Sequence, residues 1–158
     1  MGVSFGYYDD YFIEQFQKFP NAVLHVINGI VDSKKDLRKL YNKNIKILIL
    51  GYKQFRRGND YYSASVEKLK SDMNELLPEI LNRFKVVSFD NLAIKQLKIK
   101  KLLSEGQWNE FYQGDDGSHT MYVDLVNKKF AVNSTSDKTF DLLDSVDEMF
   151  DIVKGEKL

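Results

Sequence analysis

The feature that most constrains the fold is a short apolar run at residues 45–53, of sequence IKILILGYK. Its apolar positions are almost continuous, and the run ends at Gly51. A strand without a polar face is typical of a parallel sheet that helices cover on both faces. Polar residues follow at its carboxyl end, where ligands collect in parallel α/β folds. The run therefore predicts an α/β fold with a ligand edge.

Three other segments have strand-like character: residues 2–5, 22–27 and 85–89. Between and after them, apolar side chains recur at helical spacing, which predicts helices over residues 9–19, 33–41, 66–84 and 92–103, and a further turn over 104–112. Asp9 and Asp10 are suited to cap the first helix, and Ser33 with Asp36 the second. Four strand–helix units are too few for a closed eight-fold barrel. We expect an open or partial parallel β/α barrel of about four units.

The period of the pattern changes after residue 114. Apolar and polar residues alternate in HTMYVDLV, and Asn127-Lys128 is suited to turn the chain into FAVNS, so residues 115–136 predict a β-hairpin. Ser145 and Glu148 form a capping box for a helix within residues 137–158. No linker separates these parts from residues 1–114, and we expect one domain over residues 1–158.

Charge and cysteine content exclude several classes of function. Lys plus Arg and Asp plus Glu number 23 each, so net charge gives no general attraction to nucleic acid or anionic membranes. The absence of cysteine excludes thiolate nucleophiles and cysteine-bound iron–sulfur clusters. No apolar stretch is long enough for a transmembrane helix and the first residues do not form a signal peptide, which predicts a cytoplasmic protein.

Five stretches together resemble a group of bacterial and phage radical S-adenosylmethionine proteins: HVINGI, ILILGYK, KVVSFDNLAIKQL, FYQGDDGSHTMYVDLV and FAVNSTS. The resemblance covers residues 2 to about 150 and corresponds to the carboxyl-terminal half of those proteins. It implies the last four of six strand–helix units of a partial barrel, with S-adenosylmethionine and substrate at the strand carboxyl ends.

The chain departs from this family because it has no three-cysteine motif for a [4Fe–4S] cluster. Without the cluster, the resemblance implies a protein that is not catalytic by itself and holds a vestigial or complementary site for a nucleoside or amino-acid type of molecule. An amino-terminal half-protein, a second copy or the hairpin would cover the open edge at residues 2–5. We expect no other cofactor.

Polar residues that follow the expected strands define the candidate ligand site: Asn28, Gly29, Gly51, Tyr52, Lys53, Asp90 and Asn91. The same residue types are also common in turns. His25, within a strand, would be either a ligand partner or a buried core histidine. A further hypothesis is a small enzyme that uses Asp90, His25 and Lys53.

An aromatic and basic loop, residues 52–62, follows the central strand, and no regular element is expected over residues 54–62. It carries the candidate partner-binding residues Phe55, Arg56, Arg57, Tyr61 and Tyr62. Rings interleaved with cations are suited to clamp a phosphate or carboxylate, to stack a base or to anchor a partner protein. The alternative function is therefore a small binding or inhibitory protein, of phage or mobile-element type, that acts on a host protein. The other interpretation is a solvated loop whose rings fold onto the core. The group Asp115, Asp116 and His119 is better explained as a turn than as a metal site.

Overall fold

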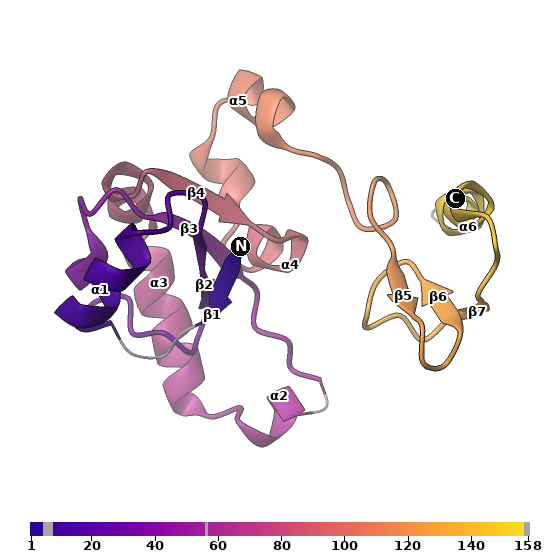
Figure 1. Cartoon of the computed structure of the whole chain (residues 1–158), viewed down its shortest axis with the longest axis horizontal. Helices are drawn as coiled ribbons and strands as arrows, with labels where there is room; N and C mark the ends of the chain where they lie inside the picture. The colour runs from indigo at the N-terminus through magenta and orange to yellow at the C-terminus, as the bar shows by residue number, and fades with distance from the viewer. Residues whose placement is uncertain (5–7, 56, 157–158) are drawn as a thin grey trace. The chain divides into compact units, whose positions relative to one another are not determined.

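The computed structural model describes residues 1–4, 8–55 and 57–156, and it divides into two compact units, Met1–Ser104 and Glu105–Leu158 (Figure 1). The first unit holds a four-stranded sheet with its helices, and the second holds a three-stranded sheet with a helix at each end of the unit. A single domain over residues 1–158 stays a prediction.

The sheet of the first unit contains β1 (Gly2–Ser4), β2 (Val23–Ile27), β3 (Lys46–Leu50) and β4 (Val86–Phe89). Its order is β1-β2-β3-β4, and every neighbouring pair is parallel. One row of the register runs Ser4, His25, Leu48 and Ser88. The predicted parallel α/β sheet is thus confirmed, although Phe5, the last residue of the first expected strand, lies outside the described residues.

The helical segments between and after these strands are α1 (Asp10–Gln17), η1 (Leu37–Leu40), α2 (Arg57–Asp60), α3 (Ala64–Arg83), α4 (Asn91–Gln96) and η2 (Ile99–Leu102). Asp9 caps α1 by accepting the Phe12 N–H at 2.8 Å, as predicted. The expected second helix is only the short 3₁₀ segment η1, and the predicted capping pair Ser33 and Asp36 is wrong. The Asp36 side chain caps nothing, whereas Asp32 accepts the Lys35 N–H at 2.9 Å.

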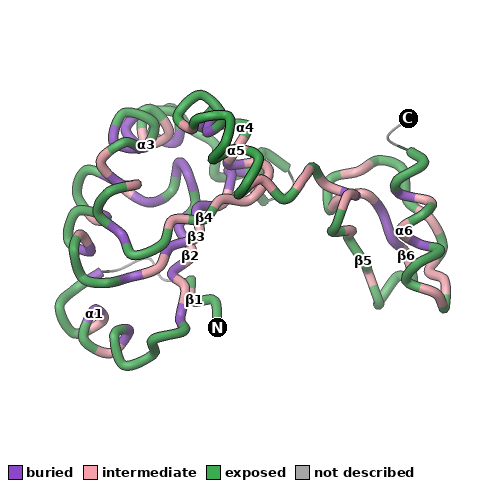
Figure 2. The backbone as a smooth tube through the Cα atoms, turned by 90° about the horizontal axis from the view of Figure 1, so that it is seen from above, coloured by how far each residue is buried: buried purple, intermediate pink, exposed green. Residues whose placement is uncertain are grey.

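Burial alternates along the strands of the first unit. Leu24, Val26, Ile47 and Ile49 are fully buried and share one core with the buried side chains of α1, η1 and α3 (Figure 2). The opposite face carries Val23, His25 and Leu48, which are half-buried, and Ile27 and Val86, which are exposed. The expectation of helices on both faces is therefore wrong. On β3 this second face carries Leu48 and Leu50 beside Lys46, so the run has apolar residues on both faces although only one face is fully buried.

The second unit contains α5 (Glu105–Phe111), β5 (Tyr122–Asp124), β6 (Lys129–Ala131), β7 (Phe140–Asp141) and α6 (Val146–Gly155). β5 and β6 form the predicted hairpin, and β7 adds an antiparallel strand that the sequence pattern does not predict. Ser145 caps α6 as expected, accepting the Glu148 N–H at 3.3 Å. Phe130, Met149 and Val153 form a small core of their own.

Candidate functional site

Asp90 links the carboxyl ends of β3 and β4. It ends β4 and caps α4, where its Oδ1 accepts the Ala93 N–H at 2.7 Å. The same oxygen accepts the Gly51 N–H at 2.9 Å. One carboxylate oxygen therefore binds two backbone groups from different elements, while Oδ2 has no hydrogen-bond partner among the described residues. Gly51 is required here because an added Cβ would lie 2.4 Å from Cγ of Leu92.

Gln96, at the end of α4, fixes the backbone of Tyr52. Its Oε1 accepts the Tyr52 N–H at 3.0 Å, and its Nε2 donates to the Tyr52 carbonyl at 2.8 Å. The Asn28 amide also donates to Gln96 Oε1, at 3.0 Å. Sequence reasoning missed Gln96 because no motif distinguishes it from other glutamines. The one sequence feature that could have placed Gln96 near the carboxyl ends of the strands is its position six residues after the Asp90 cap, in the same helix.

Asn28 is positioned by the fold rather than presented to solvent. The residue is 1 % exposed, and its backbone N–H donates to the Leu50 carbonyl at 2.9 Å. Its Oδ1 is buried without a partner among the described residues. Gly29 follows with a φ of +91°, a left-handed conformation that favours glycine, and Val66 of α3 leaves no space for a Cβ. Both residues therefore support the edge and do not line its surface.

A groove of about 370 Å³ opens at this edge of the sheet. It is lined by Ile27, Ile30, Leu50, Gly51, Tyr52, Lys53, Gly58, Tyr61 and Asp90. Four predicted ligand-binding residues, Gly51, Tyr52, Lys53 and Asp90, therefore come together. Asn28, Gly29, Asn91 and His25 are not among the lining residues. The groove has apolar walls with one ammonium group and one carboxylate, a combination that suits a small molecule with an apolar part and polar groups.

His25 lies in the row of the half-exposed sheet face, away from the groove lining. Its Nδ1 is 3.5 Å from the Ser4 Oγ, and its ring occupies the space above Gly2, where a Cβ would lie 2.4 Å from Nε2. The structure thus does not place His25 beside Asp90 and Lys53, which the small-enzyme hypothesis requires.

The aromatic and basic loop contains one regular element, the single turn α2, where none was expected. Phe55 and Tyr61 are 46 % and 64 % exposed, while Tyr52 is buried and donates its hydroxyl to the Gly58 carbonyl at 2.6 Å. Arg57 is exposed in α2, and Arg56 lies outside the described residues. The rings of this loop therefore divide into an inward one, Tyr52, and outward ones.

A cation that sequence reasoning missed meets these rings from α3. Lys70 Nζ is 5.4 Å from the ring centre of Tyr52 and 5.6 Å from that of Tyr62. The Tyr62 hydroxyl donates to Glu67 at 2.8 Å, which raises the pKa of Tyr62. Lys70, hydrogen-bonded to Glu67, is the main cause of a lowered pKa for that carboxyl. The base of the loop is therefore held by a charged network.

Two acidic residues of the group considered as a metal site, Asp115 and Asp116, make structural hydrogen bonds. Asp115 accepts the Tyr112 hydroxyl at 2.8 Å, and Asp116 accepts the Asn133 amide at 3.3 Å. Within the described ranges, no three acidic, histidine or cysteine side chains gather in an arrangement suited to a metal ion. In the same part of the chain, no helix combines the length and apolar character that a membrane crossing needs.

Comparison of the chain with models of protein families, with curated proteins and with solved structures gives no significant match. The fold class is therefore defined by the chain's own topology: a four-stranded parallel α/β unit with a separate small antiparallel unit. Function has to be argued from the groove, the exposed loop and the half-open sheet face.

Proposed function

We propose that the first unit is the back portion of a β/α partial barrel, without an iron–sulfur cluster, that binds a small molecule and is not catalytic by itself. The strand order supports this proposal, because parallel strands that follow one another in sequence order are the pattern of β/α barrels. Doubly wound sheets instead reverse their order at a switch point. The burial of only one sheet face is also expected of a barrel wall, whose inner face turns toward strands from elsewhere.

The observation that carries the binding proposal is the groove at the carboxyl ends of β2 and β3. Its walls combine Ile27, Ile30 and Leu50 with the Tyr61 ring, and its polar groups are Lys53 and the Asp90 carboxylate. A nucleoside or amino-acid derivative has the matching parts, a planar or aliphatic group with hydroxyl, amino and carboxyl groups. By its sequence resemblance, S-adenosylmethionine is the first compound to test.

A second protein chain is proposed to complete the structure. The half-exposed sheet face carries Val23, Ile27, Leu48 and Val86, and β1 and β4 form the two edges of the sheet. Unpaired strand edges beside apolar surface are usually covered in natural proteins. An amino-terminal half-protein that carries the missing strands, or a second copy of this chain, would supply this cover.

Calorimetric titration with S-adenosylmethionine, adenosine and methionine tests the binding proposal. Ile30, 48 % exposed on the groove wall, is the residue to change, and Leu102, 44 % exposed in η2, is the matched control. We expect Ile30→Glu to weaken binding at least about tenfold, because it places a charge against an apolar surface. Leu102→Glu should bind as the unchanged protein does. A flat trace at millimolar concentrations, or equal effects of both variants, would overturn the proposal.

A second candidate function is the binding of a host protein through the loop at residues 52–62. Its support is the exposure of Phe55 and Tyr61 beside Arg57, since exposed rings and arginine are common interface anchors. A pull-down with Arg56→Ala and Arg57→Ala combined, compared with Leu102→Ala, tests it. Loss of the captured protein in the double arginine variant alone supports this function, whereas unchanged capture excludes the loop as the interface.

A further inference from the structure

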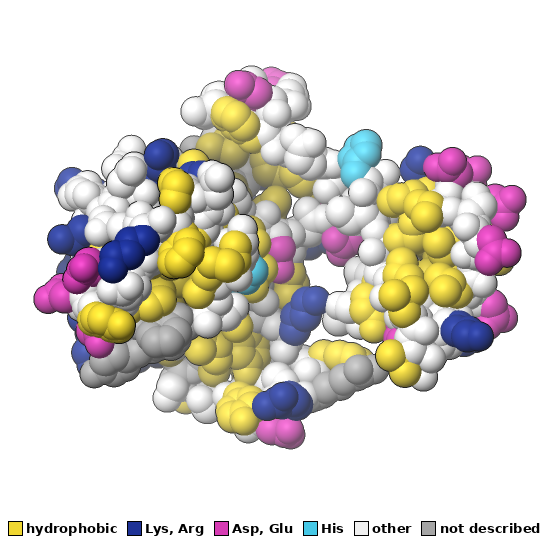
Figure 3. Space-filling model, viewed as in Figure 1, with side chains coloured by type: hydrophobic (Ala, Val, Ile, Leu, Met, Phe, Trp, Pro, Cys, Tyr) yellow, Lys and Arg dark blue, Asp and Glu magenta, His cyan; other side chains and the backbone are white. Residues whose placement is uncertain are grey.

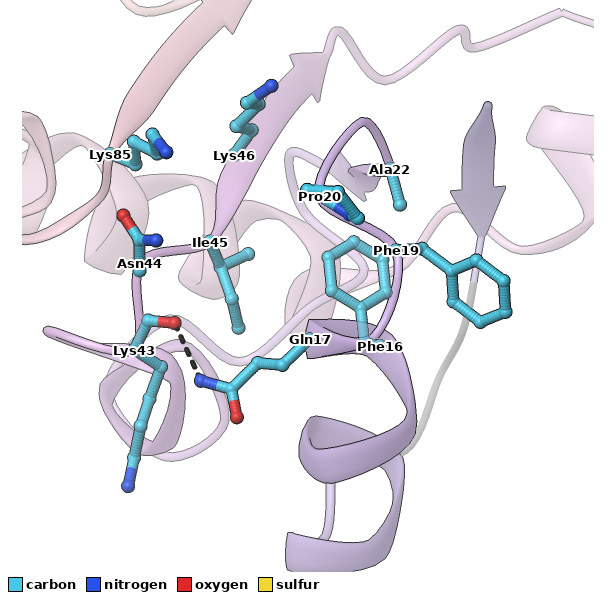
Figure 4. Close-up of a pocket in the computed structure, with 10 residues that line it drawn as sticks. All are labelled: Phe16, Gln17, Phe19, Pro20, Ala22, Lys43, Asn44, Ile45, Lys46 and Lys85. Carbon is cyan, nitrogen blue, oxygen red and sulfur yellow. Dashed lines mark hydrogen bonds between the residues drawn. The ribbon is translucent and has the colours of Figure 1, made fainter.

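A second pocket lies at the opposite end of the sheet from the groove, where β3 and β4 begin (Figure 4). Its volume is about 140 Å³. One side is apolar and comes from the end of α1 and the residues after it, including Phe16, Phe19 and Pro20. The Gln17 amide holds the other side in place by donating to the Lys43 carbonyl at 2.8 Å. The pocket is therefore bounded by parts of the fold that are tied together.

Three lysines line this pocket, and no acidic side chain does. Among the described residues, Lys43, Lys46 and Lys85 form no ion pair with a carboxylate. Elsewhere in the first unit, lysines are commonly paired: Asp72 binds Lys34 at 2.8 Å and Lys68 at 2.9 Å. Positive charge is thus left uncompensated at this pocket, which makes the entry of an anion favourable.

Two of the three lysines, Lys46 and Lys85, are placed to bind the same anion. Figure 4 shows the side chains of Lys46 and Lys85 ending on the same side, above Asn44, while Lys43 points the other way. The backbones of Lys46 and Lys85 lie on neighbouring strands. The Lys85 N–H donates to the Ile45 carbonyl at 2.9 Å, and Lys46 pairs with Val86. Lys46 is half-buried, whereas Lys85 is exposed.

Charge is distributed unequally between the two units, which the zero net charge of the whole chain conceals. Residues 1–104 contain 18 Lys and Arg against 11 Asp and Glu, a formal charge of +7. Residues 105–158 contain five against 12, a formal charge of −7. Acidic side chains are prominent on the visible face of the second unit in Figure 3. The unit that holds the lysine pocket is therefore the one with an excess of positive charge.

We propose that this pocket binds the phosphate group of a small phosphorylated molecule. Lys46 and Lys85 bind the phosphate oxygens, and the apolar wall at Pro20 contacts the rest of the molecule. A phosphate monoester carries about −1.5 to −2 charges at neutral pH, which matches two ammonium groups better than a single carboxylate does. This site is independent of the groove, because the two sets of lining residues share no member.

Calorimetric titration with pyrophosphate, AMP and adenosine tests the proposal in the full chain. We expect pyrophosphate and AMP to bind and adenosine not to bind, with affinity falling as salt is raised. The double variant Lys46→Gln and Lys85→Gln should weaken AMP binding at least about tenfold, the effect of losing a hydrogen bond to a charged group. Lys35→Gln is the matched control, because Lys35 is exposed and unpaired among the described residues.

Three results would overturn the proposal. One is the absence of heat with both pyrophosphate and AMP at millimolar concentration. Another is unchanged affinity in the double variant. The third is an equal loss in Lys35→Gln, which would mean that only general charge attracts the anion. Thermal unfolding of each variant serves as a control for folding, and Gln retains most of the lysine side chain, so we expect the fold to be kept. None of these results depends on binding of S-adenosylmethionine.

Discussion

The Asp90 carboxylate lies 2.9 Å from the backbone nitrogen of Gly51 and so joins the end of β3 to the start of α4. Its oxygen Oδ1 also accepts the N–H of Ala93 within the cap of that helix. The edge of the candidate groove is therefore built from one side chain that satisfies backbone groups in two elements. We therefore expect small substitutions at Asp90 and Gly51 to lower the stability of the fold.

Replacement of Asp90 should cost more stability than replacement of an ordinary cap. We expect Asp90→Ala to lower the free energy of unfolding by about 2–3 kcal/mol, because two hydrogen bonds to a charged acceptor are lost. Asp9 accepts one backbone N–H, from Phe12, and Asp9→Ala should cost about 1 kcal/mol. Urea denaturation of both variants makes the comparison. Equal losses would mean that the bond to Gly51 contributes nothing.

Gly51 should not tolerate even the smallest side chain. A Cβ there would lie 2.4 Å from Leu92 Cγ and 2.8 Å from the Ala93 nitrogen, so α4 must move. We expect Gly51→Ala to destabilise the fold by about 1–3 kcal/mol, the range for overpacking. Gly106 is the control, because nothing lies within 4 Å of its added Cβ in α5, and Gly106→Ala should stabilise by about 0.5–1 kcal/mol. Thermal or urea unfolding showing no difference between the two would contradict the close packing of Leu92.

Tyr8 should make stability fall at high pH. Burial, with a smaller effect of Asp36, raises the pKa of Tyr8 from 10.0 to about 12. The stability linked to this group is present below pH 10.0 and is lost as the pH rises toward about 12, since the unfolded chain releases the proton first. Tyr8→Phe should reduce that fall in unfolding free energy, measured by urea denaturation across this range.

The same variant should be harmless at neutral pH. The Tyr8 hydroxyl is buried with no hydrogen-bond partner among the described residues, so its removal breaks no such bond. We expect the unfolding free energy of Tyr8→Phe to be unchanged or raised by about 1 kcal/mol. A clear loss at neutral pH would show that the hydroxyl has a partner in solution.

Asp72 should contribute to acid sensitivity. Hydrogen bonds from Lys34 and then Lys68 lower the pKa of Asp72 below its ordinary value of 3.8. Its contribution is fully present above pH 3.8 and is lost as the pH falls through the lowered folded value. Asp72→Asn should therefore flatten the dependence of unfolding free energy on pH below about pH 4. An unchanged slope would show that the ion pairs are not maintained in solution.

Much of the fold follows from local patterns in the sequence. The apolar runs around Val23, Ile47 and Val86 predict strands that the structure places in one parallel sheet, and the change to alternation near Met121 predicts the hairpin. Both signals reflect how a side chain must be buried in its own element. The sequence could not predict whether helices cover the second face of the sheet, because the same apolar residue types occur on half-buried and on fully buried faces.

The candidate site was only partly predictable for a related reason. Gly51, Tyr52, Lys53 and Asp90 follow strands directly, so topology brings them together. Gln96 and Lys70 reach the same region from helices, through contacts between residues distant in sequence. The pocket at Lys46 and Lys85 also depends on the packing of α1 against the beginnings of two strands, which no local pattern specifies.

The most direct test of the account is to map amide chemical shifts in the full chain during titration with S-adenosylmethionine. The account predicts changes concentrated at the groove, in residues 27–30, 50–53, 58–61 and 90–93, and largely removed by Ile30→Glu. Changes concentrated in the second unit, or no change at millimolar concentration, would contradict a small-molecule site at the carboxyl ends of the strands.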